Sequence, residues 1–296
     1  MLKRLTLLVV ALSVASAQSP CVLRVEHALG TACLKGRVER VAVLDWRPLE
    51  DLLLLGVKPV AGADLKDFPK WVPLDLPSGL PDLGSRTEPN LERLAALRPD
   101  LILGYSGFQG RLYPRLEALA PTVLLDYLPP KEQLSAMRAH FRLHARMVGK
   151  EGEADRILRN LDRKLAQARS LLAQKGLLQK PFLLLQPWTD GQVANVFTRD
   201  TLASELLEAM GLRNAWTGGA EAFGLSRVGL EGLAALFREH PSALVFYIAQ
   251  PNFAPKVEAL KPAGVRLLAL PEDTWTYGGP ASAEALVDRI LGALGR

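Results

Sequence analysis

The sequence predicts an α/β protein made of two Rossmann-like lobes that are joined by a single long α-helix. In both halves short apolar stretches alternate with helical stretches, which is typical of a parallel sheet with helices on both faces. Between the halves, Glu151–Lys175 is long, amphipathic and almost free of strand signals. The halves also echo each other, because NLERLAALRPDLILGY is similar to GLEGLAALFREHPSALVFYI, and this repeat indicates two units of similar build. One continuous doubly wound domain is the alternative, and it fits the helical interruption less well.

The composition is that of a globular protein. Of the 296 residues, 49% are hydrophobic and 23% are charged, which is enough for two ordinary domains with real cores. The formal net charge is +5, but the positive residues are spread thinly and form no long basic run. We therefore expect no nucleic-acid partner.

Residues 1–17 are typical of a signal peptide. Lys3 and Arg4 precede the apolar run Leu5–Val14, and residues 15–17, Ala-Ser-Ala, directly after it form an A-x-A cleavage site. The run is too short to span a bilayer as a helix, and a buried N-terminal helix is the alternative. The Gln-Ser-Pro before Cys21 lacks the small and apolar residues of a lipobox, so we do not expect a lipoprotein. We expect a soluble, exported protein of the cell envelope.

Two cysteines follow in the predicted mature chain. Cys21 and Cys33 flank VLRVEHALGTA, in which two short alternating runs around a Leu-Gly turn predict a β-hairpin. An oxidising compartment permits a disulfide that would pin this hairpin. Two small buried thiols are the alternative, because the sequence does not fix the Cα separation that a bridge requires.

Residues 18–148 are predicted to form the N-terminal lobe. After the hairpin come a buried strand, a helix that ends at Gly56 and a short strand, in the stretches RVAVLDW, PLEDLLLLGV and KPVAGAD. A helix followed by a buried strand is then predicted twice, in NLERLAALRPDLILGY and RLYPRLEALAPTVLLDY. Asn90 is the expected N-cap of the first of these helices. Lys131–Gly149 has helical periodicity.

Residues 149–177 are predicted to form the long connecting helix. Its apolar stripe consists of residues at three-to-four spacing, namely Ile157, Leu158, Leu161, Leu165 and Ala168. The strand–helix alternation resumes in the C-terminal lobe, residues 178–296. The predicted strands there are PFLLLQPW, SALVFYI and RLLALPED, and the predicted helices include TLASELLEAMG and SAEALVDRILGAL.

Aromatic residues gather at strand ends and in glycine-rich loops. The carboxyl ends of the strands and the loops that follow them are where a bilobed α/β protein binds its ligand. As a set from both halves, these aromatics indicate a binding surface, whereas for each one alone the alternative is a loop anchor packed on the core. They are Trp46, Trp71, Tyr105, Phe108, Trp188, Phe223, Trp275 and Tyr277.

Arg86 lies in the turn GSRTEPN just before a helix begins. The turn has a use for glycine and serine, but not for a guanidinium group. Arg86 is therefore either a surface cation without a role or a residue that the turn presents to a ligand.

The sequence offers weak grounds for a metal site or an enzyme. His140 and His144 are at i,i+4 on a helix without a third ligand, so we place them on a solvated face. GYSGF lacks the second glycine of a nucleophile elbow, and there is no Walker A sequence. Acid–base pairs could be drawn from Asp45, Glu50 and Asp190, although Asp45 also suits a helix cap. We expect no intrinsic cofactor, no direct metal site and no enzyme activity, with a hydrolase as the alternative.

Several stretches together resemble one known family. HALGTA, RVAVLDW, LLLLGVKPVAGAD, KWVP, GSRTEPNLERLAALRPDLIL, RNAW and WTYGG are similar to the iron(III)-hydroxamate (ferrichrome-type) siderophore-binding proteins, the soluble receptors of ABC iron importers. The resemblance runs from about His27 to the end of the chain. It implies the class III periplasmic binding protein fold and the capture of a ferric siderophore for a membrane permease. Iron(III) would enter only within the bound complex.

The resemblance also implies a binding site. The arginine at the Arg86 position hydrogen-bonds the iron-bound hydroxamate oxygens, and a planar, permanently charged fork suits such partly negative atoms. This chain has Phe108 where a tyrosine is usual and Phe223 where a tryptophan is common, and Tyr105 is a candidate substitute for the missing hydroxyl. The family's pocket aromatics correspond to Trp71, Phe108, Phe223, Trp275 and Tyr277, with Trp46 nearby.

Other wrapped metal chelates are the alternative ligands within the same fold, namely cobalamin, haem and a ferric catecholate. A catecholate complex carries net negative charge and would favour several pocket cations. The sequence nominates Arg86 and Arg227 for the site, so we expect a neutral ligand.

Glu92 and Glu231 occupy matching places in the two LE-x-LAAL helices. An acidic residue in the first turn of a helix is favoured by the helix dipole and needs no partner. The resemblance implies instead that these glutamates, one on each lobe, meet arginines of the permease. It also implies a monomer with a shallow, largely preformed cleft that closes little.

Overall fold

The computed structural model describes residues 20–188, 191–261 and 264–295. The predicted signal peptide, residues 1–17, and Asp190 lie outside the described residues. No helix in the described ranges is long and apolar enough to cross a membrane.

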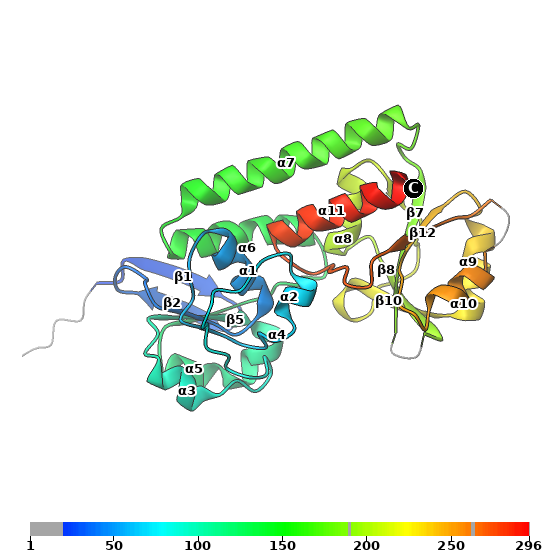
Figure 1. Cartoon of the computed structure of the whole chain (residues 1–296). Helices are drawn as coiled ribbons and strands as arrows, with labels where there is room; N and C mark the ends of the chain where they lie inside the picture. The colour runs from blue at the N-terminus through cyan, green and yellow to red at the C-terminus, as the bar shows by residue number, and fades with distance from the viewer. Residues whose placement is uncertain (1–19, 189–190, 262–263, 296) are drawn as a thin grey trace, which may run out of the picture.

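A parallel four-stranded sheet forms the centre of the first half (Figure 1). Its strand order is β4-β3-β5-β6, and the strands are β3 (Val41–Val43), β4 (Ala61–Gly62), β5 (Leu101–Tyr105) and β6 (Thr122–Leu125). Successive strand residues point to opposite faces, and both faces are packed, which explains why these strands are apolar throughout. The helices of this half are α1 (Trp46–Leu54), α2 (Phe68–Trp71), α3 (Leu91–Ala96), α4 (Ser106–Gln109), α5 (Tyr113–Glu117) and α6 (Gln133–Met147), with the 3₁₀ helix η1 (Gly110–Leu112) between α4 and α5.

The predicted hairpin precedes this sheet. Strands β1 (Leu23–His27) and β2 (Gly30–Leu34) pair antiparallel, and the backbone N–H of Ala28 donates to the Leu124 carbonyl of β6 at 3.1 Å. Cys21 and Cys33 are disulfide-bonded, with their Cα atoms 5.4 Å apart. The disulfide joins Cys21, just before β1, to Cys33 in β2 of the hairpin.

The second half contains a mixed sheet. Four of its strands run parallel, namely β7 (Pro181–Pro187), β9 (Arg213–Asn214), β11 (Leu244–Ile248) and β12 (Arg266–Leu270). Strands β8 (Val193–Phe197) and β10 (Leu225–Gly229) are antiparallel to their neighbours. The parallel sheet expected for this half is therefore present as four strands, and two antiparallel strands extend it. A short loop joins β7 to β8, and such a loop can connect only antiparallel strands.

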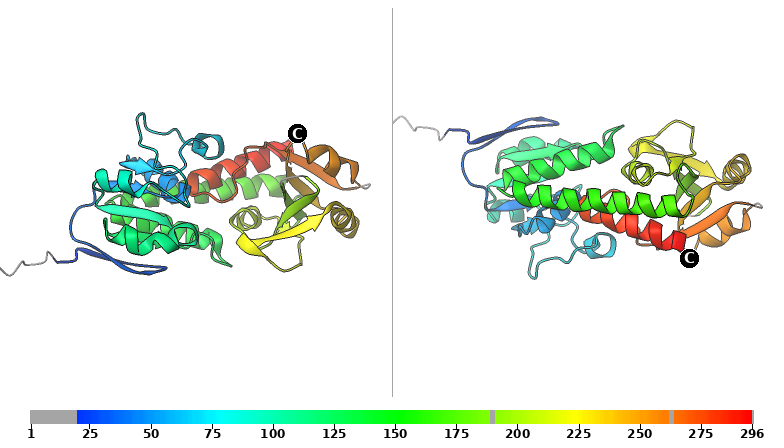
Figure 2. Two further views of the ribbon diagram at one scale, coloured as in Figure 1. Left: turned by 90° about the horizontal axis from the view of Figure 1, so that it is seen from below. Right: turned by 90° about the horizontal axis from the view of Figure 1, so that it is seen from above.

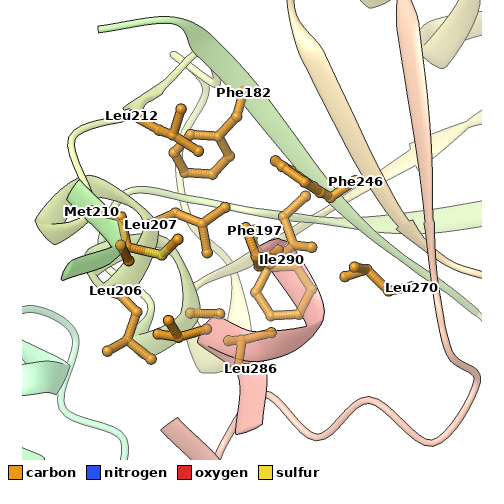
Figure 3. Close-up of a cluster of buried hydrophobic side chains, with 14 of the residues drawn as sticks. Phe182, Phe197, Leu206, Leu207, Met210, Leu212, Phe246, Leu270, Leu286 and Ile290 are labelled. Carbon is orange, nitrogen blue, oxygen red and sulfur yellow. The ribbon is translucent and has the colours of Figure 1, made fainter. Parts of the chain in front are cut away.

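Helices α8 (Leu202–Ala209), α9 (Leu230–Glu239), α10 (Ala254–Ala259) and α11 (Pro280–Gly295) cover this second sheet. Figure 3 shows the core between the sheet and two of these helices. Phe182 and Phe246 from the strands meet Leu207 of α8 and Ile290 of α11, and all four side chains are buried. The last helix of the chain therefore belongs to the core of the second half.

Helix α7 (Glu151–Gln174) joins the two halves, as the apolar spacing predicts (Figures 1 and 2). Its first turns pack on α6, and its later turns enter the core of the second half. Helix α11 runs beside α7 and also contacts α1 of the first half, so a second helix bridges the junction. The fold class is confirmed with this addition, while the exact lobe boundaries stay predictions.

Two carboxylates cap helices across the junction. Glu50 of α1 is fully buried and accepts hydrogen bonds from Gly279 N at 2.9 Å, Ser282 N at 2.8 Å and Ser282 Oγ at 2.7 Å, at the start of α11. Glu205 of α8 accepts from the backbone N–H groups of Gln133 and Leu134, at the start of α6, at 2.9 and 2.7 Å. Glu50 of the first half therefore accepts hydrogen bonds from the first turn of α11, which packs in the second half. Glu205 of the second half does the same for α6 of the first half. Glu50, considered above as an acid–base group, uses its oxygens in this structural role.

Candidate functional site

A cavity of about 520 Å³ lies between the two halves, at the loops that follow the strands. Its walls combine aromatic rings from both halves with a few polar side chains, which is the usual make-up of a small-molecule site. The predicted residues that line it are Arg86, Tyr105, Phe108, Trp188, Phe223, Trp275 and Tyr277. The sequence therefore located most of the wall through the positions of its aromatics.

Arg86 is held in a fixed pose. Its guanidinium carbon lies 4.1 Å from the centre of the Trp46 ring and 5.6 Å from that of Phe108. Its Nε donates to Asp64 Oδ2 at 3.0 Å, and its Nη1 lies 3.7 Å from Asp45 Oδ2. These contacts leave other N–H groups of the fork for a ligand, because a guanidinium has five donors. The turn therefore presents Arg86 to the cavity.

Gln109, which the sequence analysis did not single out, holds three loops of the site together. This side chain is fully buried, and its Nε2 donates to the carbonyls of Leu44 at 3.1 Å and Arg86 at 2.6 Å. Its Oε1 accepts from the backbone N–H of Tyr105 at 2.6 Å. All of its partners are backbone atoms distant in the sequence or at the strand end, so the sequence carries no pattern that reveals this role.

Trp46 and Trp71 support the cavity without lining it. Trp46 packs beneath Arg86, and its Nε1 donates to the Asp64 carbonyl at 2.9 Å. The Trp275 ring lies 5.4 Å from that of Trp46 and 6.0 Å from that of Trp71. Trp46 and Trp71 therefore fit the alternative interpretation, in which an aromatic residue packs on the core as an anchor. Both rings contact Trp275 and support it at the wall.

Arg227 lies on strand β10 outside the cavity wall. Its guanidinium carbon is 4.5 Å from the centre of the Trp188 ring, and Trp188 is 43% exposed. Arg227 therefore supports an aromatic residue at the rim.

Tyr105 and Phe108 lie side by side in the wall, with ring centres 5.1 Å apart in an edge-to-face arrangement. Burial, together with the charges of Asp126 and Asp45, raises the pKa of Tyr105 above its ordinary value. The hydroxyl therefore stays protonated at neutral pH and can donate to an acceptor.

Arg47 is a cavity residue that the sequence analysis missed. It lines the wall from the first turn of α1 and is 4% exposed. Its Nη1 donates to the carbonyls of Tyr277 at 3.3 Å and Tyr127 at 3.5 Å. A usable signal existed, because Arg47 directly follows the carboxyl end of a predicted strand, where ligand sites form.

Asp45 lies in the same wall and caps α1, as considered above, by accepting from the backbone N–H of Arg47 at 3.1 Å. Burial raises the pKa of this carboxyl, and the charge of Arg86 opposes that rise. The wall also contains three amide side chains of the second half, namely Gln186, Asn195 and Gln250. The wall therefore offers both N–H donors and carbonyl acceptors.

The expected solvated face for His140 and His144 is wrong. His144 is fully buried, with its Nδ1 2.7 Å from Asp51 Oδ2 and its Nε2 3.2 Å from the Tyr127 hydroxyl. Burial and the nearby Arg47 lower the pKa of His140 to about 3. Both residues contact Tyr127 of the cavity wall, His144 through its hydrogen bond and His140 with ring centres 5.4 Å apart. The sequence did not show this, because Asp51, the other partner of His144, lies far away in the chain on α1.

No group of three or more potential ligand residues that could hold a metal ion is found in the described ranges. Glu92 and Glu231 are exposed in the first turns of α3 and α9, one in each half.

The sequence matches a family model described as periplasmic binding protein over residues 41–256. The iron(3+)-hydroxamate-binding protein FhuD of Escherichia coli is 30% identical over 197 residues, which are 66% of this chain and 65% of FhuD. The probable siderophore-binding lipoprotein YfiY of Bacillus subtilis is 30% identical over 154 residues, which are 51% of this chain and 46% of YfiY. The chain therefore matches less than two thirds of the length of these relatives.

Solved structures extend the likeness over most of the chain. The Fe3+-Desferal-bound siderophore-binding protein FhuD from Vibrio cholerae has a TM-score of 0.76 and 27% identity, and the match covers 88% of this chain and 98% of that one. The petrobactin-binding protein YclQ from Bacillus subtilis has a TM-score of 0.74 at 18% identity, over 93% of this chain and 99% of that one, which supports the fold alone. These relatives are binding proteins rather than enzymes.

Proposed function

The chain belongs to the periplasmic binding protein family, and from that premise we propose that it captures a ferric siderophore of the hydroxamate type and delivers it to the permease of an ABC importer. Arg86 carries the proposal. A guanidinium fixed between Trp46 and Phe108, with donors free on the cavity side, suits the partly negative oxygens around a chelated iron. The iron would arrive already wrapped, so the protein needs to recognise only the complex.

The rest of the cavity fits the same ligand class. Its volume of about 520 Å³ lies within the usual range for small-molecule sites. Aromatic rings offer flat apolar contact for the ligand body, while Arg86, Tyr105 and the amides of the second half offer donors for its oxygens. Recognition would then rest on shape and hydrogen bonds to the chelate.

Lobe closure is expected to be small. Helices α7 and α11 both cross the junction, and Glu50 and Glu205 cap helices across it. A wide hinge motion would break these buried contacts, so capture in a largely preformed cleft is favoured. We also propose that the protein acts as a monomer in the periplasm or cell envelope after removal of residues 1–17, without a lipid anchor.

Intrinsic tryptophan fluorescence tests the ligand class. Titration with ferrichrome is expected to give saturable quenching at micromolar or lower concentration, because Trp188 and Trp275 line the cavity. Trp188→Phe should reduce the quenched amplitude, whereas Trp216→Phe, at a partly buried position packed against the core of the second half, should leave the response to ligand unchanged. A response to cobalamin, haem or a ferric catecholate without one to ferrichrome would overturn the hydroxamate assignment.

Glu92 and Glu231 are proposed to dock the permease, one from each half. Charge reversal of both to Lys is expected to abolish iron uptake in cells that depend on this protein, while ferrichrome affinity stays the same, because both residues are exposed and outside the cavity wall. The matched control reverses Glu26 and Glu239, which are also exposed. Unchanged uptake, or a loss of affinity in the purified variant, would contradict the docking role.

A further inference from the structure

Asn195 is a buried amide whose hydrogen-bonding groups are unused. It lies on strand β8, lines the cavity and is only 5% exposed. Its side chain has no hydrogen-bond partner among the residues that the structure describes. Buried polar side chains nearly always have such a partner, because an unpaired one destabilises the fold. Asn195 therefore needs an explanation.

The three other buried amide side chains in the described ranges are fully used. Gln109, Gln133 and Asn214 each donate and accept hydrogen bonds with other residues, at distances of 2.6 to 3.1 Å. All three hold loops or helix ends in place. Asn195 differs from them in lying at the wall of the cavity.

The amide of Asn195 is open to the cavity. Some polar side-chain atoms of the described residues are sealed in the interior without a partner, among them Arg47 Nε and Asp51 Oδ1, but no atom of Asn195 is. Because Asn195 lines the cavity and is otherwise enclosed, the small exposed part of this residue lies on the cavity side. A ligand in the cavity can therefore reach the amide.

Gln186 gives Asn195 a neighbour of the same kind. The two residues lie opposite each other in the register of β7 and β8, so their side chains point to the same face of the sheet. Gln186 also lines the cavity without a hydrogen-bond partner for its side chain among the described residues. Arg227, opposite Asn195 on β10, stacks on Trp188 instead. The second half therefore presents a pair of amides to the ligand.

Resting on the function proposed above, we propose that Asn195 and Gln186 bind amide groups in the organic backbone of the chelate. A side-chain amide offers N–H donors and a carbonyl acceptor, and a ligand amide satisfies both, whereas iron-bound hydroxamate oxygens only accept. Arg86 then binds the hydroxamate oxygens from the first half, while the amide pair binds the backbone from the second. The substrate class is a ferric hydroxamate built on a peptide or other amide-bearing backbone.

Two neutral ferric hydroxamates test this assignment. Ferrichrome carries its three hydroxamates on a cyclic hexapeptide, and tris(acetohydroxamato)iron(III) has three hydroxamates without any other amide. Asn195→Leu removes the amide at nearly constant size, and it should weaken ferrichrome at least fivefold and the simple chelate less than twofold. Calorimetric titration measures ferrichrome affinity. Competition with ferrichrome, in excess acetohydroxamic acid and with that acid alone as the blank, measures the weaker simple chelate.

Gln186→Met is the second variant and should show the same selective loss. The matched control is Gln167→Leu, which removes an exposed amide on α7 outside the cavity wall and should leave both affinities unchanged. If Asn195→Leu does not fold, Gln186→Met carries the comparison, because Gln186 is only half-buried.

The thermal midpoint of the ligand-free protein separates recognition from packing. Asn195→Leu should melt at the same temperature as the wild type or higher, because it removes an unpaired buried amide. A lower midpoint together with full ferrichrome affinity would assign Asn195 to the fold and overturn the proposal.

Equal weakening of both chelates by Asn195→Leu would also overturn the assignment, because the amide would then act on the hydroxamate oxygens or on the shape of the wall. If the simple chelate displaces no ferrichrome from the wild type, the ferrichrome affinities of the two variants and the control decide alone. If the wild-type protein binds neither chelate, the proposed function fails, and the assignment of the amide pair fails with it.

Discussion

Arg86→Ala is expected to weaken ferrichrome binding by roughly 10- to 100-fold. Hydrogen bonds to a charged group contribute about 1.5–3 kcal/mol, and each 1.4 kcal/mol corresponds to about a tenfold change in Kd. The loss is larger than the missing bonds alone, because Asp45, which lines the cavity beside Arg86, would then face the ligand oxygens without the cation that separates them. Fluorescence titration measures this change.

Arg86→Lys refines the test. Lysine keeps the charge but cannot stack as a plane on Trp46, nor can it hold Asp64 while offering a fork to the ligand. Its affinity should therefore lie between those of the wild type and Arg86→Ala. Arg111→Ala, at an exposed position outside the cavity wall, serves as the control. Full affinity in Arg86→Ala would remove the observation that carries the proposed function.

Glu50→Ala is expected to lower the free energy of unfolding by about 3 kcal/mol or more. The substitution leaves two backbone N–H groups and one hydroxyl at the start of α11 without their buried acceptor, and each such group costs about 1–3 kcal/mol. Glu50→Gln keeps one acceptor oxygen and should cost less. Urea unfolding measures the differences, with Glu151→Ala as an exposed control. An unchanged midpoint for Glu50→Ala would show that α11 does not depend on this cap.

Glu50 also predicts a pH dependence. Burial, and then the charge of Asp51, raise the pKa of Glu50 above its ordinary value of 4.5. The folded protein therefore holds this proton more tightly than the unfolded chain does. The contribution to stability is complete below pH 4.5 and is lost as the pH rises through the folded-state pKa. The difference in free energy of unfolding between the wild type and Glu50→Gln should become smaller as the pH rises through the folded-state pKa of Glu50.

Local patterns predicted those parts of the fold that depend on neighbours in the sequence. The apolar spacing of Glu151–Lys175 predicted α7, the alternation around the Leu-Gly turn predicted the hairpin, and Asn90 caps α3 as expected, accepting from Arg93 N at 2.8 Å. Strands β8, β9 and β10 were missed, because polar residues interrupt the short apolar stretches VANVF and LSRVG of β8 and β10, and β9 has only two residues.

The unpredicted features are contacts between distant residues. Glu50 meets Ser282, and His144 meets Asp51, across separations that no periodicity encodes. Arg47 reads as an ordinary charged residue on a helix until the fold buries it beside the cavity. The aromatic positions predicted most of the cavity wall, but which of them line it and which lie beneath it depends on packing in three dimensions.

Gln109 has a consequence for how such a site can change over time. Its side chain hydrogen-bonds only to main-chain atoms, at Leu44, Tyr105 and Arg86. These hydrogen bonds therefore do not depend on which side chains those positions carry. Substitutions at Arg86 or Tyr105 can alter the chemistry of the wall while the loops keep their course. The side chains of the wall can then be exchanged while the backbone of the loops stays the same. These loops are therefore suitable for a randomised library that seeks receptors for new chelates.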